Sequence, residues 1–85
     1  MVYIVTKTRK LLANNIVYYR VKNGWSQDTL ADKLDTKRQY LCEIENEKRN
    51  VSTDYIDRLA ATFDIEPHEL LLYRPPVDVR RIDGR

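Results

Sequence analysis

Cysteine and histidine are nearly absent from this chain, and their scarcity excludes several kinds of site. The one cysteine, Cys42, has no partner for an internal disulfide and cannot supply a thiolate metal cluster. We expect Cys42 to fill a small space on a helix, as free cysteines usually do. The one histidine, His68, has no metal-ligating residue at a useful spacing, so neither a metal-binding nor a catalytic role is expected for it.

Long hydrophobic runs and catalytic motifs are also lacking. No apolar run approaches the roughly 20 residues of a membrane span, and residues 1–6 have neither a leading basic segment nor a small-residue cleavage site. The chain has no glycine-rich phosphate loop, no paired carboxylates in an apolar setting and no nucleophile with a histidine. We therefore expect a cytoplasmic protein that is not an enzyme, has no membrane contact, and binds no metal, cofactor or small-molecule ligand.

The size and charge of the chain fit a small globular domain. Eighty-five residues give a marginal core, so a homodimer is expected. The net charge of +2 is too small to indicate nucleic acid by itself. Its distribution is uneven, since residues 1–22 have five basic and no acidic residues, whereas residues 51–72 have five acidic residues and one basic residue. A protein with one side toward phosphates would suit this pattern, and an ordinary mixed surface explains it equally well.

Apolar residues recur at helical spacing along most of the chain. Leu12, Ile16 and Tyr19 mark one face of a helix from about residue 8 to residue 22, and Asn23-Gly24 ends it. Three further helices show the same pattern and are expected at about 26–34, 37–45 and 52–63. Their inner-face residues are Leu30, Ala31, Leu34, Tyr40, Leu41, Ile44, Ile56, Leu59, Ala60 and Phe63.

Polar residues and proline set the ends of these helices. Ser26 and Ser52 are suited to accept hydrogen bonds from the first free backbone N–H groups of their helices. Asp35-Thr36 interrupts the pattern, because Asp tolerates the left-handed backbone that a sharp reversal needs. Pro67 suits the first turn of a fifth helix, which ends near Leu72.

These elements predict an all-α, compact five-helix domain. We expect an N-terminal extension at 1–7, the domain at 8–72 with a helix-turn-helix at about 26–45, and an extended or disordered tail at 73–85. Val2–Val5 is β-branched and aromatic enough to form a short terminal β extension, paired with the tail or with a second copy.

Two helices of about eight residues joined by a short break form a helix-turn-helix unit. The segments "SQDTLA" at 26–31 and "YLCEIE" at 40–45 resemble the S-Q-x-x-L-A … Y-I-x-x-I-E signature of the Xre/phage-repressor family. The resemblance extends from about Leu11 to Leu71. The small size and the Lys48-Arg49-Asn50 loop are similar to restriction-modification controller proteins and compact phage repressors.

This resemblance implies a repressor-like fold, a dimer on a two-fold DNA operator, and a third helix in the major groove. The positions that match base-reading sites of the family are Lys37, Arg38, Gln39 and Glu43. Arg or Lys can donate to guanine, Gln can pair with adenine, and Glu can accept from cytosine N4. The alternative is a solvated polar helix face.

Other positions of the family motif imply phosphate contacts and a dimer contact. The implied phosphate contacts are Gln27, Tyr40, Asn46, Lys48 and Arg49. For Tyr40, the ring could pack on the second helix while its hydroxyl reaches a phosphate. The implied dimer contacts are Leu70, Leu71 and Leu72, with the N-terminal Val2–Val5 or the tail adding to them.

Arg20 and Glu45 match a structural pair of the family that joins the first helix to the end of the third. The alternative is two unrelated surface charges. The chain also departs from the family pattern. Asp35 and Glu47 stand where glycine is preferred, Lys37 replaces a capping Ser or Thr, and Val51 replaces a common proline.

The sequence therefore predicts a sequence-specific, double-stranded DNA-binding transcriptional regulator, as a dimeric repressor or autoregulator. The alternative is a protein-interaction module or antitoxin-type partner on a helix-turn-helix scaffold.

Overall fold

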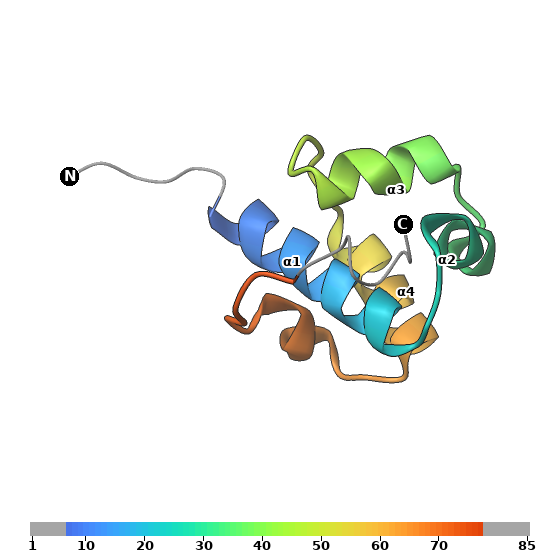
Figure 1. Ribbon diagram of the computed structural model, residues 1–85. Coiled ribbons are helices and arrows are strands. Elements are labelled where there is room, and N and C mark those ends of the chain that lie inside the picture. Colours follow the sequence, from blue (N-terminus) through green and yellow to red (C-terminus); the bar gives the residue numbers. More distant parts are fainter. Residues whose placement is uncertain (1–6, 78–85) are drawn as a thin grey trace.

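Residues 7–77 are described by the computed structural model, and they form a small bundle of helices (Figure 1). The elements are α1 (Lys7–Lys22), α2 (Gln27–Leu34), α3 (Arg38–Glu45), α4 (Thr53–Phe63) and the short η1 (Pro67–Leu71). In Figure 1, α1 crosses the middle of the molecule, α3 runs along its upper edge, and η1 lies beneath α1. No strand occurs within residues 7–77, and none of their helices is long and apolar enough to cross a membrane.

The all-α class and the helix-turn-helix are as predicted, but the count of five α-helices is wrong. The described residues 7–77 form four α-helices, and the fifth segment, η1, is a 3₁₀-helix of five residues. A buried amide holds the end of this segment, because Asn15 Nδ2 donates to the carbonyls of Leu70 and Leu72 at 2.7 Å each. The chain leaves helical geometry where these carbonyls meet Asn15. The predicted extension at Val2–Val5 lies outside the described residues.

The predicted helix ends follow from short-range hydrogen bonds. Ser26 Oγ accepts from the Thr29 N–H at 3.0 Å, and Ser52 Oγ accepts from the Tyr55 N–H at 3.1 Å. Asp35, just after α2, has a left-handed backbone with φ of 56°. The break between α2 and α3 is therefore a helix C-cap, and it redirects the chain within three residues.

Apolar side chains from every helix meet in one core. Its fully buried members, all at 2% exposure or less, are Ile16, Leu30, Ala31, Leu34, Leu41, Ile44, Leu59, Ala60 and Leu70. Leu70 is 0% exposed, so the prediction that its side chain contributes to a dimer surface is wrong. Leu71 and Leu72 are 39% and 47% exposed and remain available to a partner.

Residues 73–77 form an extended strap that runs back along α1. Arg74 Nε donates to Asn15 Oδ1 at 2.7 Å, and Arg74 Nη2 donates to the Tyr19 hydroxyl at 2.6 Å. Asn14 fixes the next residues, because its Nδ2 donates to the Arg74 carbonyl and its Oδ1 accepts from the Val77 N–H, both at 3.1 Å. The described part of the predicted tail is thus extended and anchored, and the rest of it lies outside the described residues.

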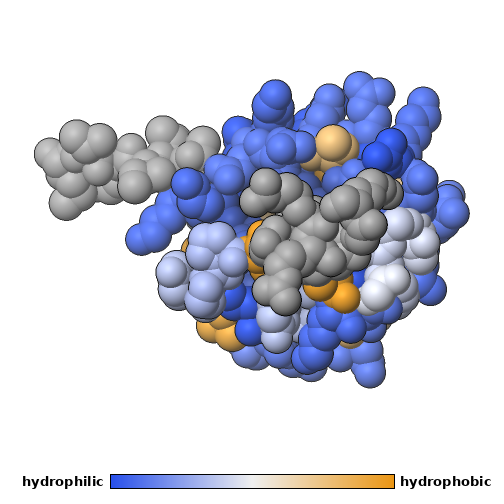
Figure 2. All heavy atoms as spheres, in the orientation of Figure 1, coloured by the Kyte–Doolittle hydropathy of each residue, from blue (hydrophilic) through white to orange (hydrophobic). Residues whose placement is uncertain are grey.

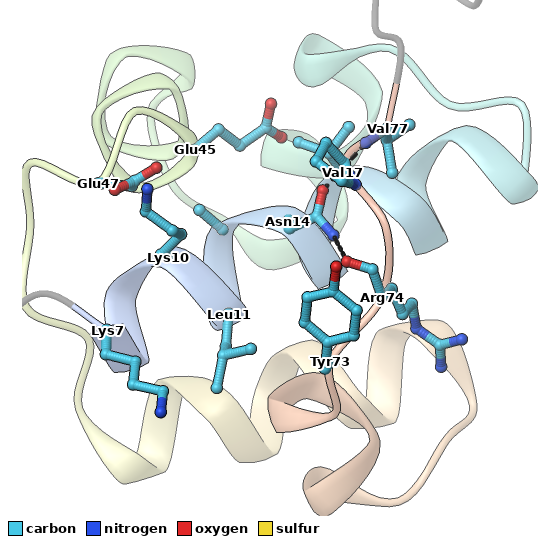
Figure 3. Close-up of a pocket in the computed structure, with 12 residues that line it drawn as sticks. Lys7, Lys10, Leu11, Asn14, Val17, Glu45, Glu47, Tyr73, Arg74 and Val77 are labelled. Atoms are coloured by element: carbon cyan, nitrogen blue, oxygen red, sulfur yellow. Dashed lines mark hydrogen bonds between the residues drawn. The ribbon is translucent and has the colours of Figure 1, made fainter.

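A cavity of about 620 Å³ lies between α1, this strap and the end of α3 (Figure 3). Its lining includes Leu11 and Val17 of α1 and Tyr73 and Val77 of the strap. Glu47, in the loop after α3, also lines it. The sequence gives no sign of this cavity, because it depends on where the strap returns to α1.

Glu47 has a left-handed backbone with φ of 64°, at a position where the family prefers glycine. Most residues with a side chain are strained in that region by roughly 1–2 kcal/mol, and glycine is not. Glycine loses more conformational entropy on folding, which offsets part of the stability gained by relieving the strain. We expect Glu47→Gly to raise the free energy of unfolding by about 0.5–1 kcal/mol, measured by urea denaturation. Glu47→Ala removes the same charge but keeps the strain, so equal stabilities of the two variants would refute this explanation.

Candidate nucleic-acid interface

The α2–turn–α3 unit presents one face of α3 to solvent. Leu41 and Ile44 are buried in the core, as are Leu30 and Leu34 of α2. Because these side chains fix the inner side of both helices, the opposite side of α3 points outward, along the upper edge of Figure 1. Hydrophilic residues cover most of this upper region in the space-filling view (Figure 2).

The predicted base-reading residues lie together on this outer side of α3. Lys37, Arg38 and Gln39 are exposed, and Glu43 is partly exposed. Lys37 occupies the N-cap position of α3 and makes no capping hydrogen bond with its side chain. The helix therefore begins without a side-chain cap, and the Lys37 ammonium group is left at the surface.

Arg38 has a neighbour that the sequence analysis missed. Its Nε lies 3.5 Å from Asp28 Oδ1, and both side chains are more than half exposed, at 61% and 75%. Such a surface pair contributes little to stability. It does place a carboxylate from the first turn of α2 beside an arginine from the first turn of α3.

Glu43 is held by a residue of the following loop. Arg49 Nε donates to Glu43 Oε1 at 2.7 Å, and the Arg49 guanidinium carbon lies 5.4 Å from the centroid of the Tyr40 ring. The hydrogen bond from Arg49 is the main cause that lowers the pKa of the Glu43 carboxyl, and its charge and a hydrogen bond from Gln39 lower that pKa further. Glu43 is therefore ionised at neutral pH.

The remaining loop residues are less constrained. Asn46 Nδ2 donates to the Cys42 carbonyl at 2.8 Å, which closes the end of α3. Lys48 is exposed. The Lys48 charge helps to lower the pKa of Glu43, whereas Arg49 forms a direct ion pair with Glu43.

The ring of Tyr40 packs against α4, a contact that the sequence did not indicate. Its ring meets Tyr55 of α4 edge to face, with centroids 5.4 Å apart and an interplanar angle of 84°. The Tyr55 hydroxyl lies 3.3 Å from Thr36 Oγ1. Tyr40 therefore ties the start of α3 to α4.

The expected pair between Arg20 and Glu45 is present and almost completely buried. Arg20 Nε and Nη2 donate to the two carboxylate oxygens of Glu45 at 2.9 and 3.2 Å, and the side chains are 1% and 6% exposed. Arg20 Nη1 also donates to the Trp25 carbonyl at 3.1 Å. This bidentate contact fixes the end of α3 to α1 and to the loop before α2.

Gln27, predicted to contact phosphate, belongs to the same buried cluster. Its Nε2 donates to Glu45 Oε1 at 2.9 Å, so one of its two amide N–H groups is used within the chain. Gln27 thus links the first turn of α2 to the last turn of α3. Its backbone N–H remains at the N-terminus of α2, where helices favour anions.

Cys42 lies on a helix, α3, as expected. It is partly exposed, on the outer side of α3. The helical spacing of the sequence indicates this position. Residue 42 lies about 100° around the helix from Leu41, on the side opposite to the inner pair 41 and 44. Cys42 therefore borders the predicted base-reading residues.

Comparison with known proteins agrees with this geometry. The helix-turn-helix family HTH_3 matches residues 16–70. The chain is 35% identical over 68 residues to a protein described as a hypothetical transcription factor of Neisseria meningitidis, which covers 80% of this chain and 62% of that protein. It is 38% identical over 50 residues to the control protein C.BamHI of Bacillus amyloliquefaciens, covering 59% of this chain and 62% of that protein. The chain thus spans about three fifths of the length of these curated relatives.

Solved structures show the same arrangement. The crystal structure of the hypothetical transcription factor NHTF from Neisseria superposes with a TM-score of 0.74 and 31% identity, over 92% of this chain and 85% of that chain. The restriction-modification controller protein C.AhdI from Aeromonas hydrophila superposes with a TM-score of 0.69 and 37% identity, over 73% of this chain and 94% of that chain. The chain therefore belongs to the Xre-type helix-turn-helix family.

Proposed function

We propose that this protein is a sequence-specific, double-stranded DNA-binding transcriptional regulator that reads the major groove with α3. One observation carries the proposal: the inner side of α3 is fixed by Leu41, Ile44 and the buried Arg20–Glu45 pair, while its outer side presents Lys37, Arg38 and Gln39 to solvent. A rigid helix with exposed base-reading groups is what direct readout requires. The names of its relatives, transcription factor and control protein, support the same role.

The proposal includes a homodimer on a two-fold operator. The exposed Leu71 and Leu72 are candidate contacts, with residues 2–5 as a further candidate outside the described part. In such a dimer the two copies of α3 would lie about 34 Å apart and enter successive major grooves. A protein that acts on DNA in this way works in the cytoplasm, and repression or autoregulation follows if its operator overlaps a promoter.

Salt dependence gives the most direct test of DNA binding. We expect log Kd to change steeply with log salt concentration, because each phosphate neutralised by a side chain releases counterions. Lys48→Ala should weaken binding to all DNA sequences alike and reduce the magnitude of the salt slope by about 0.9. Fluorescence anisotropy on a labelled duplex across a NaCl series measures both quantities.

The second candidate function is a protein-interaction module or antitoxin-type partner. A complex that does not weaken with salt, or no binding to any duplex, would favour this alternative. Selection of bound sequences from a random DNA pool then settles target and symmetry, since a dimeric regulator should recover a palindrome. Recovery of no common sequence would overturn sequence-specific recognition.

A further inference from the structure

Glu43 is the only acidic side chain on the outer side of α3, because the other acid of this helix, Glu45, is 6% exposed and paired with Arg20. The side chain of Glu43 is 30% exposed, and that of its partner Arg49 is 53% exposed. The closed pair is a charge-assisted hydrogen bond of 2.7 Å. The Tyr40 ring supports it by lying under the guanidinium group. This arrangement places an anion and a cation side by side on the surface proposed to face DNA.

The two members of this pair have opposite relations to DNA. The phosphate backbone attracts the Arg49 guanidinium and repels the Glu43 carboxylate. In the major groove, the amino groups of cytosine and adenine can both donate to a carboxylate, and the pairing usual for Glu is with cytosine N4. While Arg49 is held by Glu43, the pair has no net charge and Arg49 is engaged away from phosphate.

We propose that the Glu43–Arg49 pair couples cytosine recognition to a phosphate contact. On DNA with no cytosine amino group beneath Glu43, the pair stays closed and Arg49 makes no phosphate contact. On the operator, cytosine N4 donates to Glu43, the pair opens, and Arg49 binds a neighbouring phosphate. The correct base then gives both its own hydrogen bond and one additional ionic contact. This inference rests on the proposed function, and it assigns Arg49 as a conditional contact instead of a constant one.

Random-sequence DNA tests the closed state without knowledge of the operator. The full chain and its variants Glu43→Gln, Arg49→Ala and the double variant are titrated against a labelled random duplex from 50 to 250 mM NaCl. Glu43→Gln frees Arg49, so its binding should tighten several-fold at low salt and its slope should steepen by about 0.9. Arg49→Ala should keep the wild-type slope. The double variant should lose the gain that Glu43→Gln alone produces.

Two matched variants separate this inference from general charge effects. Glu47→Gln removes an acid from the same loop that no described contact joins to Arg49, so it should give less steepening than Glu43→Gln and show no dependence on Arg49. Lys48→Ala should lower the slope on every duplex. If no protein in the set shows salt-dependent binding, the proposed function itself fails. If Lys48→Ala behaves as expected but Arg49→Ala lowers the random-DNA slope equally, Arg49 is a constant contact and the coupling is overturned.

The operator, once selected, tests the open state. The wild-type slope should be steeper on the operator than on random DNA, and Arg49→Ala should reduce that difference by about 0.9. Changing the contacted C·G pair to T·A should reduce the wild-type difference by the same amount. A difference that survives both changes would overturn the proposal. Circular dichroism of each variant checks that the exposed substitutions leave the helices formed.

Discussion

Replacing Glu45 with alanine is expected to lower the free energy of unfolding by about 3–5 kcal/mol, because the change leaves the Arg20 guanidinium buried without its carboxylate. The side chains of Arg20 and Glu45 are 1% and 6% exposed, and two hydrogen bonds join them. Gln27 Nε2 loses its acceptor in the same variant. Urea denaturation followed by circular dichroism measures the loss.

The controls separate buried charge from general effects of substitution in α3. Glu43→Ala removes a partly exposed acid from the same helix, and because its pair with Arg49 lies at the surface, it should cost far less stability than Glu45→Ala. Gln27→Ala removes one hydrogen bond to Glu45 and should cost roughly 1 kcal/mol. A loss for Glu45→Ala no larger than that for Glu43→Ala would show that the pair contributes nothing in solution.

The double variant Arg20→Met with Glu45→Leu tests what the pair does for function. Replacement of a buried ion pair by apolar residues of similar volume is often close to neutral in stability. If the pair fixes the orientation of α3, this variant should stay folded while its discrimination between operator and random DNA declines. Retained discrimination would mean that the core alone sets the orientation of the helix.

The local features of this fold could be predicted because they depend on neighbouring residues. Ser26 and Ser52 cap their helices through N–H groups three positions ahead, and Asp35 takes the left-handed backbone that the break needs. The Arg20–Glu45 contact is not local, and only its position in the family motif indicated it. Helix periodicity gave the inner faces, since one side of each helix must pack against the others.

Features that depend on how helices cross were not predicted. The Tyr40 ring packs on Tyr55 of α4, and Gln27 turns inward to Glu45, because α2 and α3 meet at an angle that spacing alone does not specify. The end of η1 is held by Asn15, which lies more than fifty residues earlier. Nothing in the sequence pattern singled out Asn14 and Asn15, whose side chains anchor residues 73–77.

The exposed residues of α3 show a different limit. The match to the family motif indicated Lys37, Arg38, Gln39 and Glu43 as a group, and in the structure the first three are exposed and Glu43 is partly exposed. Their partners within the chain, Asp28 and Arg49, come from another helix and from the loop. The sequence therefore indicated which side chains could contact DNA. It did not indicate which of them must first break an ion pair within the chain.

Arg38→Ala is expected to relax discrimination at one base position by about 1–3 kcal/mol, or roughly five- to 150-fold in the ratio of Kd values. Arg38 is exposed in the first turn of α3, where its guanidinium can reach guanine O6 and N7. Its contact with Asp28 is long, at 3.5 Å, and both side chains are more than half exposed, so leaving it costs little. Kd values for the selected operator and for each single-base variant of it measure the effect.

Asp28→Ala is the matched control for Arg38→Ala. It removes the competing carboxylate and one negative charge near the proposed interface, so it should tighten binding to operator and random DNA alike without changing which base is preferred. Arg38→Lys keeps the charge but loses the two-pronged guanidinium, and it should retain most of the affinity for random DNA while losing discrimination. If Arg38→Ala instead weakens all sequences equally and Arg38→Lys restores binding in full, Arg38 contacts the backbone, because a point charge suffices for phosphate and does not suffice for guanine.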